Sequence, residues 1–308
     1  MKTIKALGVD SNFGYCQGSS HRAVHELKKN ACVASLAQAG LAIQWQQIGA
    51  LATTHPHSHD DPTNKPTNKP NTLETQLAVV NRQLASQVHD LVAAGQRFLV
   101  LGGDHSIAMG TWSGALAACR QRSGSRAQSL GLLWIDAHLD AHSFASSPSG
   151  NIHGMPLRAL LNDADPRLRR LCPQSGHLCG KNLALIGIRS FEPAEKKFLE
   201  EQQVSITYMH DMPRADCGPT LLRALGTLSK RCGSIGISLD IDAIDPRNAP
   251  GVATPEAGGL PLSSLCKALK RARLFNKLVG LEICEYDPAE DAQQRTRHAV
   301  LQLIKAIF

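Results

Sequence analysis

The sequence predicts an α/β fold: a three-layer α/β/α sandwich with a central, mainly parallel β-sheet. Short aliphatic runs recur along the chain without the polar alternation of half-exposed strands, which is typical of strands buried on both faces. Longer amphipathic stretches separate these runs, and such strand–helix alternation favours a parallel sheet covered by helices. The chain has 308 residues and no break in composition, so we expect a single domain over 1–308.

Five aliphatic runs are the predicted strands: "RFLVLGG" (97–103), "LGLLWI" (130–135), "LALIGI" (183–188), "SIGISL" (234–239) and "LVGLEI" (278–283). The clearest predicted helix covers 77–94, where apolar residues repeat at helical spacing and Gly95 follows as a stop signal. The polar, proline-rich stretch 52–72, which contains "TNKP" twice, predicts a flexible surface loop.

Composition argues against several classes of function. The formal net charge is +7, but the basic stretch 267–273 has the spacing of a solvated helix face and lacks aromatic residues for stacking bases. No apolar run reaches the roughly 18 residues of a membrane helix. The opening "MKTIKALGVD" lacks the apolar region of a signal peptide. We therefore expect a cytoplasmic protein that binds neither nucleic acid nor membranes and keeps its nine cysteines reduced.

Acidic and imidazole side chains follow four of the predicted strands. They are His105; Asp136, His138 and Asp140; Asp240 and Asp242; and Glu285. The carboxyl ends of parallel strands meet at one edge of a sheet, where ligands bind, and residues two apart in an extended chain point the same way. So many converging groups would be costly to desolvate without a cation. Their number and high carboxylate content favour two hard ions such as Mn²⁺ over a Zn²⁺ site.

Four motifs then connect the chain to a known family. In their order along the chain, "GGDHS" (102–106), "DAHLD" (136–140), "SGNIHG" (149–154) and "SLDIDAIDP" (238–246) resemble the signature stretches of the arginase, or ureohydrolase, family. The resemblance covers roughly 97–290 and implies the same α/β/α fold with two Mn²⁺ per subunit. By position, it implies that one ion is held by His105, Asp136, Asp140 and Asp240, and the other by Asp136, His138, Asp240 and Asp242. Asp136 and Asp240 would bridge the ions.

The resemblance also implies a reaction. A hydroxide shared by the two ions would attack the guanidino carbon of L-arginine, giving L-ornithine and urea. Glu285 stands where the family holds the guanidinium, and His153 matches its proton-shuttling histidine. Ser149 and Asn151 belong to the "SGN" stretch of the arginase branch, in which the serine contacts the substrate α-carboxylate.

Two departures keep alternatives open for the substrate. His142 replaces an asparagine that contacts the α-carboxylate, and Glu192 replaces an aspartate that receives the α-ammonium. Agmatine or 4-guanidinobutyrate is therefore the alternative substrate. A non-catalytic or deacetylase-like member of the same fold is a second alternative. The number of metal ions bound per chain (two, one or none) would separate these hypotheses. The family also implies a homo-oligomer, a trimer or a hexamer.

Overall fold

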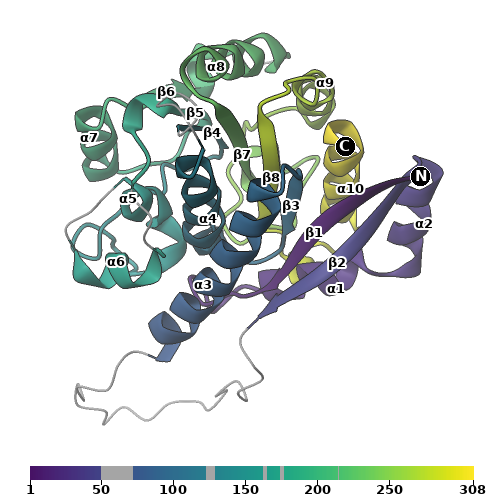
Figure 1. The fold of residues 1–308 in the computed structure, drawn as a ribbon, viewed down its shortest axis with the longest axis horizontal. Helices are drawn as coiled ribbons and strands as arrows, with labels where there is room; N and C mark the ends of the chain where they lie inside the picture. The colour runs from purple at the N-terminus through teal and green to yellow at the C-terminus, as the bar shows by residue number, and fades with distance from the viewer. Residues whose placement is uncertain (50–71, 123–128, 162–164, 174–176, 214) are drawn as a thin grey trace.

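The computed structural model describes residues 1–49, 72–122, 129–161, 165–173, 177–213 and 215–308. The predicted flexible loop at 52–72 lies outside them, apart from its last residue. The described chain forms an eight-stranded sheet in the order β2-β1-β3-β8-β7-β4-β5-β6, with every neighbouring pair parallel (Figure 1). The strands are β1 (Lys2–Asp10), β2 (Leu41–Gly49), β3 (Phe98–Leu101), β4 (Leu130–Ile135), β5 (Leu183–Ile188), β6 (Ser205–Tyr208), β7 (Ser234–Asp240) and β8 (Leu278–Cys284).

Helices cover both faces of the sheet. One face carries α1 (Ala23–Leu27), α2 (Asn30–Gln38), α8 (Gly218–Arg231), α9 (Leu262–Ala272) and α10 (Arg295–Ile307). The other carries α3 (Thr72–Ala93), α4 (Ala108–Arg120), α5 (Pro156–Leu160), α6 (Pro166–Leu171) and α7 (Pro193–Glu201). The predicted three-layer α/β/α sandwich is thereby confirmed.

Each helical layer packs on its own hydrophobic core, because successive strand residues point to opposite faces. In β3, Leu99 and Leu101 belong to one core, whereas Phe98 and Val100 belong to the other. All four are buried, which explains why the strand reads as an uninterrupted apolar run.

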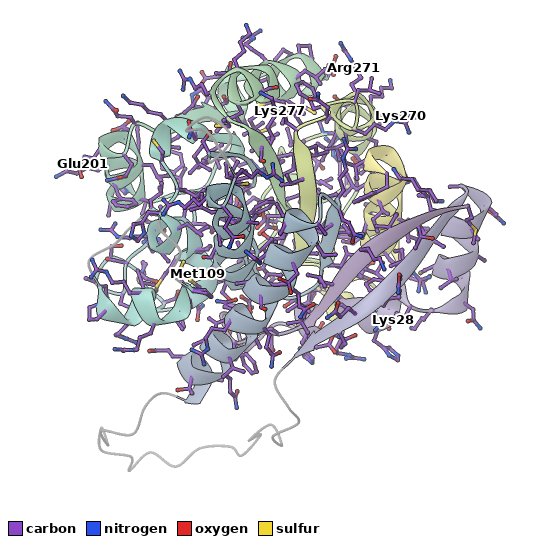
Figure 2. All side chains as sticks on the ribbon, in the orientation of Figure 1. Lys28, Met109, Glu201, Lys270, Arg271 and Lys277 are labelled. Atoms are coloured by element: carbon purple, nitrogen blue, oxygen red, sulfur yellow. The ribbon has the colours of Figure 1, made fainter. Side chains whose placement is uncertain are left out.

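The basic stretch 267–273 lies on α9 and just beyond it, with its charged side chains exposed as the sequence predicts. Figure 2 shows Lys270 and Arg271 at the outside of the molecule, whereas Met109 of α4 is fully buried. Among the described residues, no helix is both long enough and apolar enough to cross a membrane.

The five predicted strands are confirmed as β3, β4, β5, β7 and β8, and the predicted helix over 77–94 is most of α3. The sequence did not predict β1, β2 or β6. β2 and β6 are the edges of the sheet, and their half-exposed residues lack a continuous apolar run. The confirmed strands include the four neighbours β3, β8, β7 and β4, whose carboxyl ends carry the predicted metal ligands and Glu285.

Candidate metal centre and active site

A tight turn after β3 delivers His105. Gly102 and Gly103 adopt φ values of 90° and 79°, which favour glycine, and let the chain turn back over the sheet edge. The Asp104 carboxylate then accepts a hydrogen bond from the Ser106 backbone N–H at 3.0 Å and fixes the following helical turn. The turn leaves the His105 side chain buried against the ends of the central strands.

The first ligand group contains His105, Asp136, Asp140 and Asp240, and its ligand atoms all lie within 4.8 Å of one another. His105 Nδ1 is 3.2 Å from Asp136 Oδ2, 2.9 Å from Asp140 Oδ2 and 3.1 Å from Asp240 Oδ2. Both His105 Nδ1 and Asp140 Oδ2 are buried, and neither has a hydrogen-bond partner within the part of the chain that the structure describes. Three buried carboxylates around one imidazole are costly to desolvate without a cation, so this donor set fits a metal ion.

The second group contains Asp136, His138 and Asp242. His138 Nδ1 lies 3.0 Å from Asp242 Oδ2 and 3.7 Å from Asp136 Oδ1. Thr254 Oγ1 donates to Asp242 Oδ2 at 3.1 Å and helps to orient that carboxylate. Asp136 belongs to both groups and presents a different oxygen to each histidine, as a bridging ligand does. Of these two groups, Asp240 joins only the first at this distance.

A chain of hydrogen bonds orients His105 from behind. Ser238 Oγ donates to Glu282 Oε1 at 2.6 Å and lies 3.0 Å from His105 Nε2. Because the hydroxyl hydrogen of Ser238 is used, its oxygen accepts from Nε2–H, and this leaves Nδ1 as the nitrogen available to a metal ion. Trp112 Nε1 donates to the same Glu282 oxygen at 3.0 Å. Glu282 is thus a structural partner of a candidate ligand, and such partners fix the tautomer that a metal needs.

In the first group, several carboxylates are buried close together, and this shifts their pKa values. Burial, together with the nearby Asp136 carboxylate, raises the pKa of Asp140 to about 7. Burial and neighbouring carboxylates also raise the pKa of Asp240 well above its usual range. At Asp136 two adjacent imidazoles outweigh burial and lower the pKa. Positive charge is therefore what this cluster favours.

Glu285 and His153 form a pair beside the metal-ligand groups. Glu285 Oε1 accepts a 2.7 Å hydrogen bond from the His105 backbone N–H and lies 3.0 Å from His153 Nδ1. Burial alone would lower the pKa of His153, but the Glu285 carboxylate raises it to about 9. The ring of Tyr15 stacks on His153 at 4.8 Å. Glu285 and Asp140 have φ values of 62° and 48°, a strained conformation that is common at functional sites.

Ten of the twelve predicted site residues line one pocket of about 290 Å³, and the other two, His105 and Asp136, are fully buried. At the outer end, His142 Nε2 lies 2.9 Å from Glu192 Oε2. Ser149 is exposed and Asn151 is half-buried, and both belong to the pocket lining. The structure thus brings all the predicted metal, catalytic and substrate-binding residues to one region.

Other residues of the site were not predicted. Glu195 is buried, accepts from the Ala141 backbone N–H at 3.0 Å and lies 3.3 Å from His142 Nε2. Its sequence signal was the capping box that it forms with Glu192 across the proline that starts α7. Arg189 donates to several backbone carbonyls, including that of Asp242 at 2.7 Å, and no sequence pattern announces such contacts.

The fold and the site define an α/β/α protein with a candidate metal-binding site at the carboxyl edge of a parallel sheet. Comparison with known proteins identifies the family. The arginase family model matches residues 32–308. The arginase of Bacillus caldovelox is 35% identical to the chain, and the match covers 75% of each protein. The chain belongs to the arginase family.

Solved structures agree with this assignment. The native arginase of Bacillus caldovelox has a TM-score of 0.82 and 30% identity, over 100% of this chain and 98% of that one. The arginase of Entamoeba histolytica, in complex with L-ornithine, has a TM-score of 0.83 and 26% identity, over 100% and 99%. The protein is an arginase-type hydrolase acting on carbon–nitrogen bonds of linear amidines and guanidines.

Proposed function

We propose that the protein is a binuclear manganese enzyme that hydrolyses L-arginine to L-ornithine and urea. The observation that carries the proposal is one pocket onto which both the metal-ligand groups and the Glu285–His153 pair open. The six proposed ligands divide as the family resemblance implies: His105, Asp136, Asp140 and Asp240 for one ion, and Asp136, His138, Asp240 and Asp242 for the other. When bound, a pair of divalent ions supplies hydroxide near neutral pH by lowering the pKa of water.

The chain's own residues would hold and protonate the substrate. The buried Glu285 carboxylate would bind the guanidinium cation and keep its carbon beside the metal ligands. The Glu285 carboxylate raises the pKa of His153 to about 9, which favours the protonated imidazole at neutral pH. Its Nδ1 faces Glu285, so the hydrogen on Nε2 is the one available to the departing amine. Proton donation is needed because an amine anion is a poor leaving group.

The outer end of the pocket would receive the amino-acid end of the substrate. Glu192 would accept hydrogen bonds from the α-ammonium, while His142, Ser149 and Asn151 would donate to the α-carboxylate. The 2.9 Å contact between His142 and Glu192 supports this division, because a substrate zwitterion carries the complementary pair of charges. Agmatine, which lacks the carboxylate, and 4-guanidinobutyrate, which lacks the ammonium, would each leave one partner unused.

Urea release from the Mn²⁺-loaded protein tests this proposal, with L-arginine, agmatine and 4-guanidinobutyrate in parallel and a chelated control for each. We expect metal-dependent urea from L-arginine. Urea only from agmatine or 4-guanidinobutyrate would contradict the assignment of L-arginine and leave the metal chemistry in place. No urea from any of the three by the metal-loaded protein would contradict the proposed function.

We further propose that residues 1–308 form one domain and that the chain assembles as a homotrimer or hexamer, as the family resemblance implies. Light scattering coupled to gel filtration tests the assembly. A monomer at the concentration used for the activity assay would contradict it.

A further inference from the structure

Cys284 lies beside the first ligand group, at the end of β8. In the parallel pairing of β7 and β8, Asp240 is opposite Cys284, and Ser238 is opposite Glu282. Residues two apart on a strand face the same way, so these four side chains form one polar strip on a face that is otherwise apolar. Cys284 therefore continues the row that orients His105.

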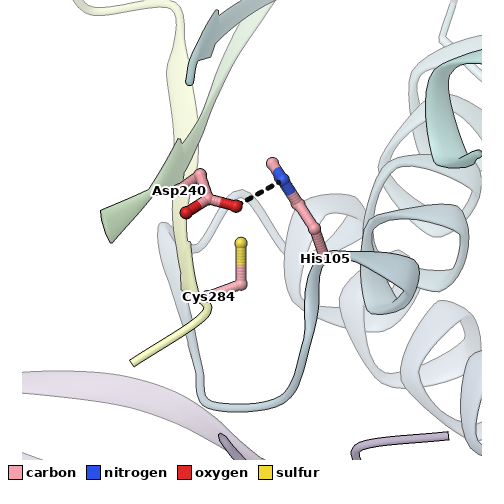
Figure 3. A group of neighbouring side chains, drawn as sticks. All are labelled: His105, Asp240 and Cys284. Carbon is pink, nitrogen blue, oxygen red and sulfur yellow. Dashed lines mark ion pairs between the residues drawn. The ribbon is translucent and has the colours of Figure 1, made fainter. Parts of the chain in front are cut away.

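The His105 imidazole spans this strip. Its Nε2 lies 3.0 Å from Ser238 Oγ, and its Nδ1 lies 3.1 Å from Asp240 Oδ2. Figure 3 shows the Cys284 thiol pointing toward the space between Asp240 and His105. One ligand atom from each of these three residues lies within 4.8 Å of the other two, and all three side chains are buried.

Two observations, one on the neighbouring His105 and one on the thiol itself, distinguish Cys284 from an ordinary core cysteine. His105 Nδ1, on a side chain only 1% exposed, faces the cluster and has no hydrogen-bond partner among the described residues. The Cys284 thiol lies 3.6 Å from the Leu239 carbonyl oxygen, a contact that a weak donor gives up at little cost. The sulfur is thus free to exchange this contact for a stronger one.

We propose that His105, Asp240 and Cys284 form a nitrogen–oxygen–sulfur site for a thiophilic divalent ion such as Zn²⁺, Co²⁺ or Cd²⁺. As that ion binds, a metal–sulfur bond forms, the S–H bond breaks and the proton leaves to solvent; no redox change takes place. Mn²⁺ prefers oxygen ligands, so with Mn²⁺ Cys284 stays a neutral thiol. This inference rests on the proposed function, which assigns His105 and Asp240 as ligands.

In the proposed site, Cys284, which directly precedes the catalytic Glu285, determines which metal ions bind. A thiophilic ion bound to Cys284 occupies His105 and Asp240, two ligands that the manganese pair needs. Cys284→Ser should weaken Zn²⁺ binding by at least about tenfold and leave Mn²⁺ affinity nearly unchanged.

Cobalt substitution tests the proposal by spectroscopy. The full-length protein is stripped of metal, loaded with Co²⁺ and analysed for cobalt content, for sulfur-to-cobalt charge transfer in the near ultraviolet, and by X-ray absorption. The variants are Cys284→Ser and Cys284→Ala. The matched control is Cys119→Ser, since Cys119 is equally buried but contacts Ser234 at the opposite end of β7 from Asp240.

We expect a charge-transfer band and a sulfur neighbour at about 2.3 Å in the unmodified protein and in the Cys119 control, both lost in the Cys284 variants. X-ray absorption on the unmodified protein decides the question even if the variants fail to fold. Bound cobalt without a sulfur neighbour, or a band that persists in the Cys284 variants, would overturn this inference and leave the proposed metal centre standing. Failure to bind cobalt at all would overturn both this inference and the proposed metal centre.

Discussion

Individual side chains in this site depend on partners that lie behind them. His105 illustrates this, because the Ser238 hydroxyl holds its Nε2 and thereby leaves Nδ1, which lies among three carboxylates, available to a metal ion. The same Ser238 is tied to Glu282, which is fully buried. A candidate metal ligand is in this way anchored to the sheet through two further side chains.

We predict that Ser238→Ala lowers Mn²⁺ affinity by about 10- to 100-fold, because Nε2–H loses its acceptor and the imidazole loses its fixed orientation. Competition with a metal-sensitive chelator measures the change. Ser263→Ala, at an exposed position of α9, is the matched control and should have no effect. Equal affinities for Ser238→Ala and the unmodified protein would contradict the orienting role of Ser238.

The protonation of His153 is predicted to depend on Glu285. In the chelated protein, NMR titration should give His153 a pKa near 9, and Glu285→Gln should lower it toward the usual 6.5. The raised pKa means that the pair stabilises the folded protein fully below about pH 6.5. This stabilisation is lost as the pH rises through about 9. Glu290→Gln, an exposed substitution, is the control; an unchanged His153 pKa in Glu285→Gln would refute the assignment.

Substrate choice is predicted to depend on His142. Its loss removes a hydrogen bond to a charged group, which is worth about 1.5–3 kcal/mol. His142→Ala should therefore raise KM for L-arginine by about 10- to 100-fold and barely change KM for agmatine, which has no carboxylate. Steady-state urea assays with both substrates provide the measurement. Equal increases for the two substrates would show that His142 does not read the carboxylate.

At the scale of elements, glycines in the central strands make room for aromatic rings. A Cβ on Gly236 of β7 would lie 2.1 Å from the Trp112 ring, and one on Gly280 of β8 would lie 2.4 Å from Phe98. Trp112 also donates a hydrogen bond to Glu282, which orients the site through Ser238. The same tryptophan of α4 therefore packs on the sheet and supports the site. Strand packing and site geometry are therefore coupled.

Gly236→Ala is predicted to destabilise the fold by about 1–3 kcal/mol, because the added methyl group overpacks against Trp112. Urea unfolding measures the loss. Gly226→Ala in α8 is the matched control: its Cβ meets nothing within 4 Å, and higher helix propensity should stabilise the protein by up to about 1 kcal/mol. Similar stability changes for the two variants would contradict this account of the packing.

The sequence predicts the elements that are buried on both sides better than those at the edges. Strands such as β4 and β7 read as apolar runs because both of their faces are covered, whereas β2 alternates glutamines with apolar residues at an edge. The site follows the same rule. Its ligands come from period-two spacing after strands, but the contacts of Ser238 and Cys284 depend on the register between β7 and β8, which no sequence pattern reports.

For the whole molecule, the sheet order explains why distant segments build one site. The loops after β3, β4, β7 and β8 are separated along the chain but leave four adjacent strands at the same edge. Helical layers pack on both faces of these strands. The candidate ligands His105, Asp136 and Asp240 thus come from three strand ends. Ions bound between them would link the ends of β3, β4 and β7.

We propose that these strand ends hold a pair of metal ions. The most direct test is to load the protein with Mn²⁺, remove free metal and count the bound ions per chain by elemental analysis. We expect two ions per chain, and only one or none in Asp136→Ala, because Asp136 belongs to both ligand groups. A single ion per chain in the unmodified protein, or none, would contradict the binuclear centre and the mechanism proposed from it.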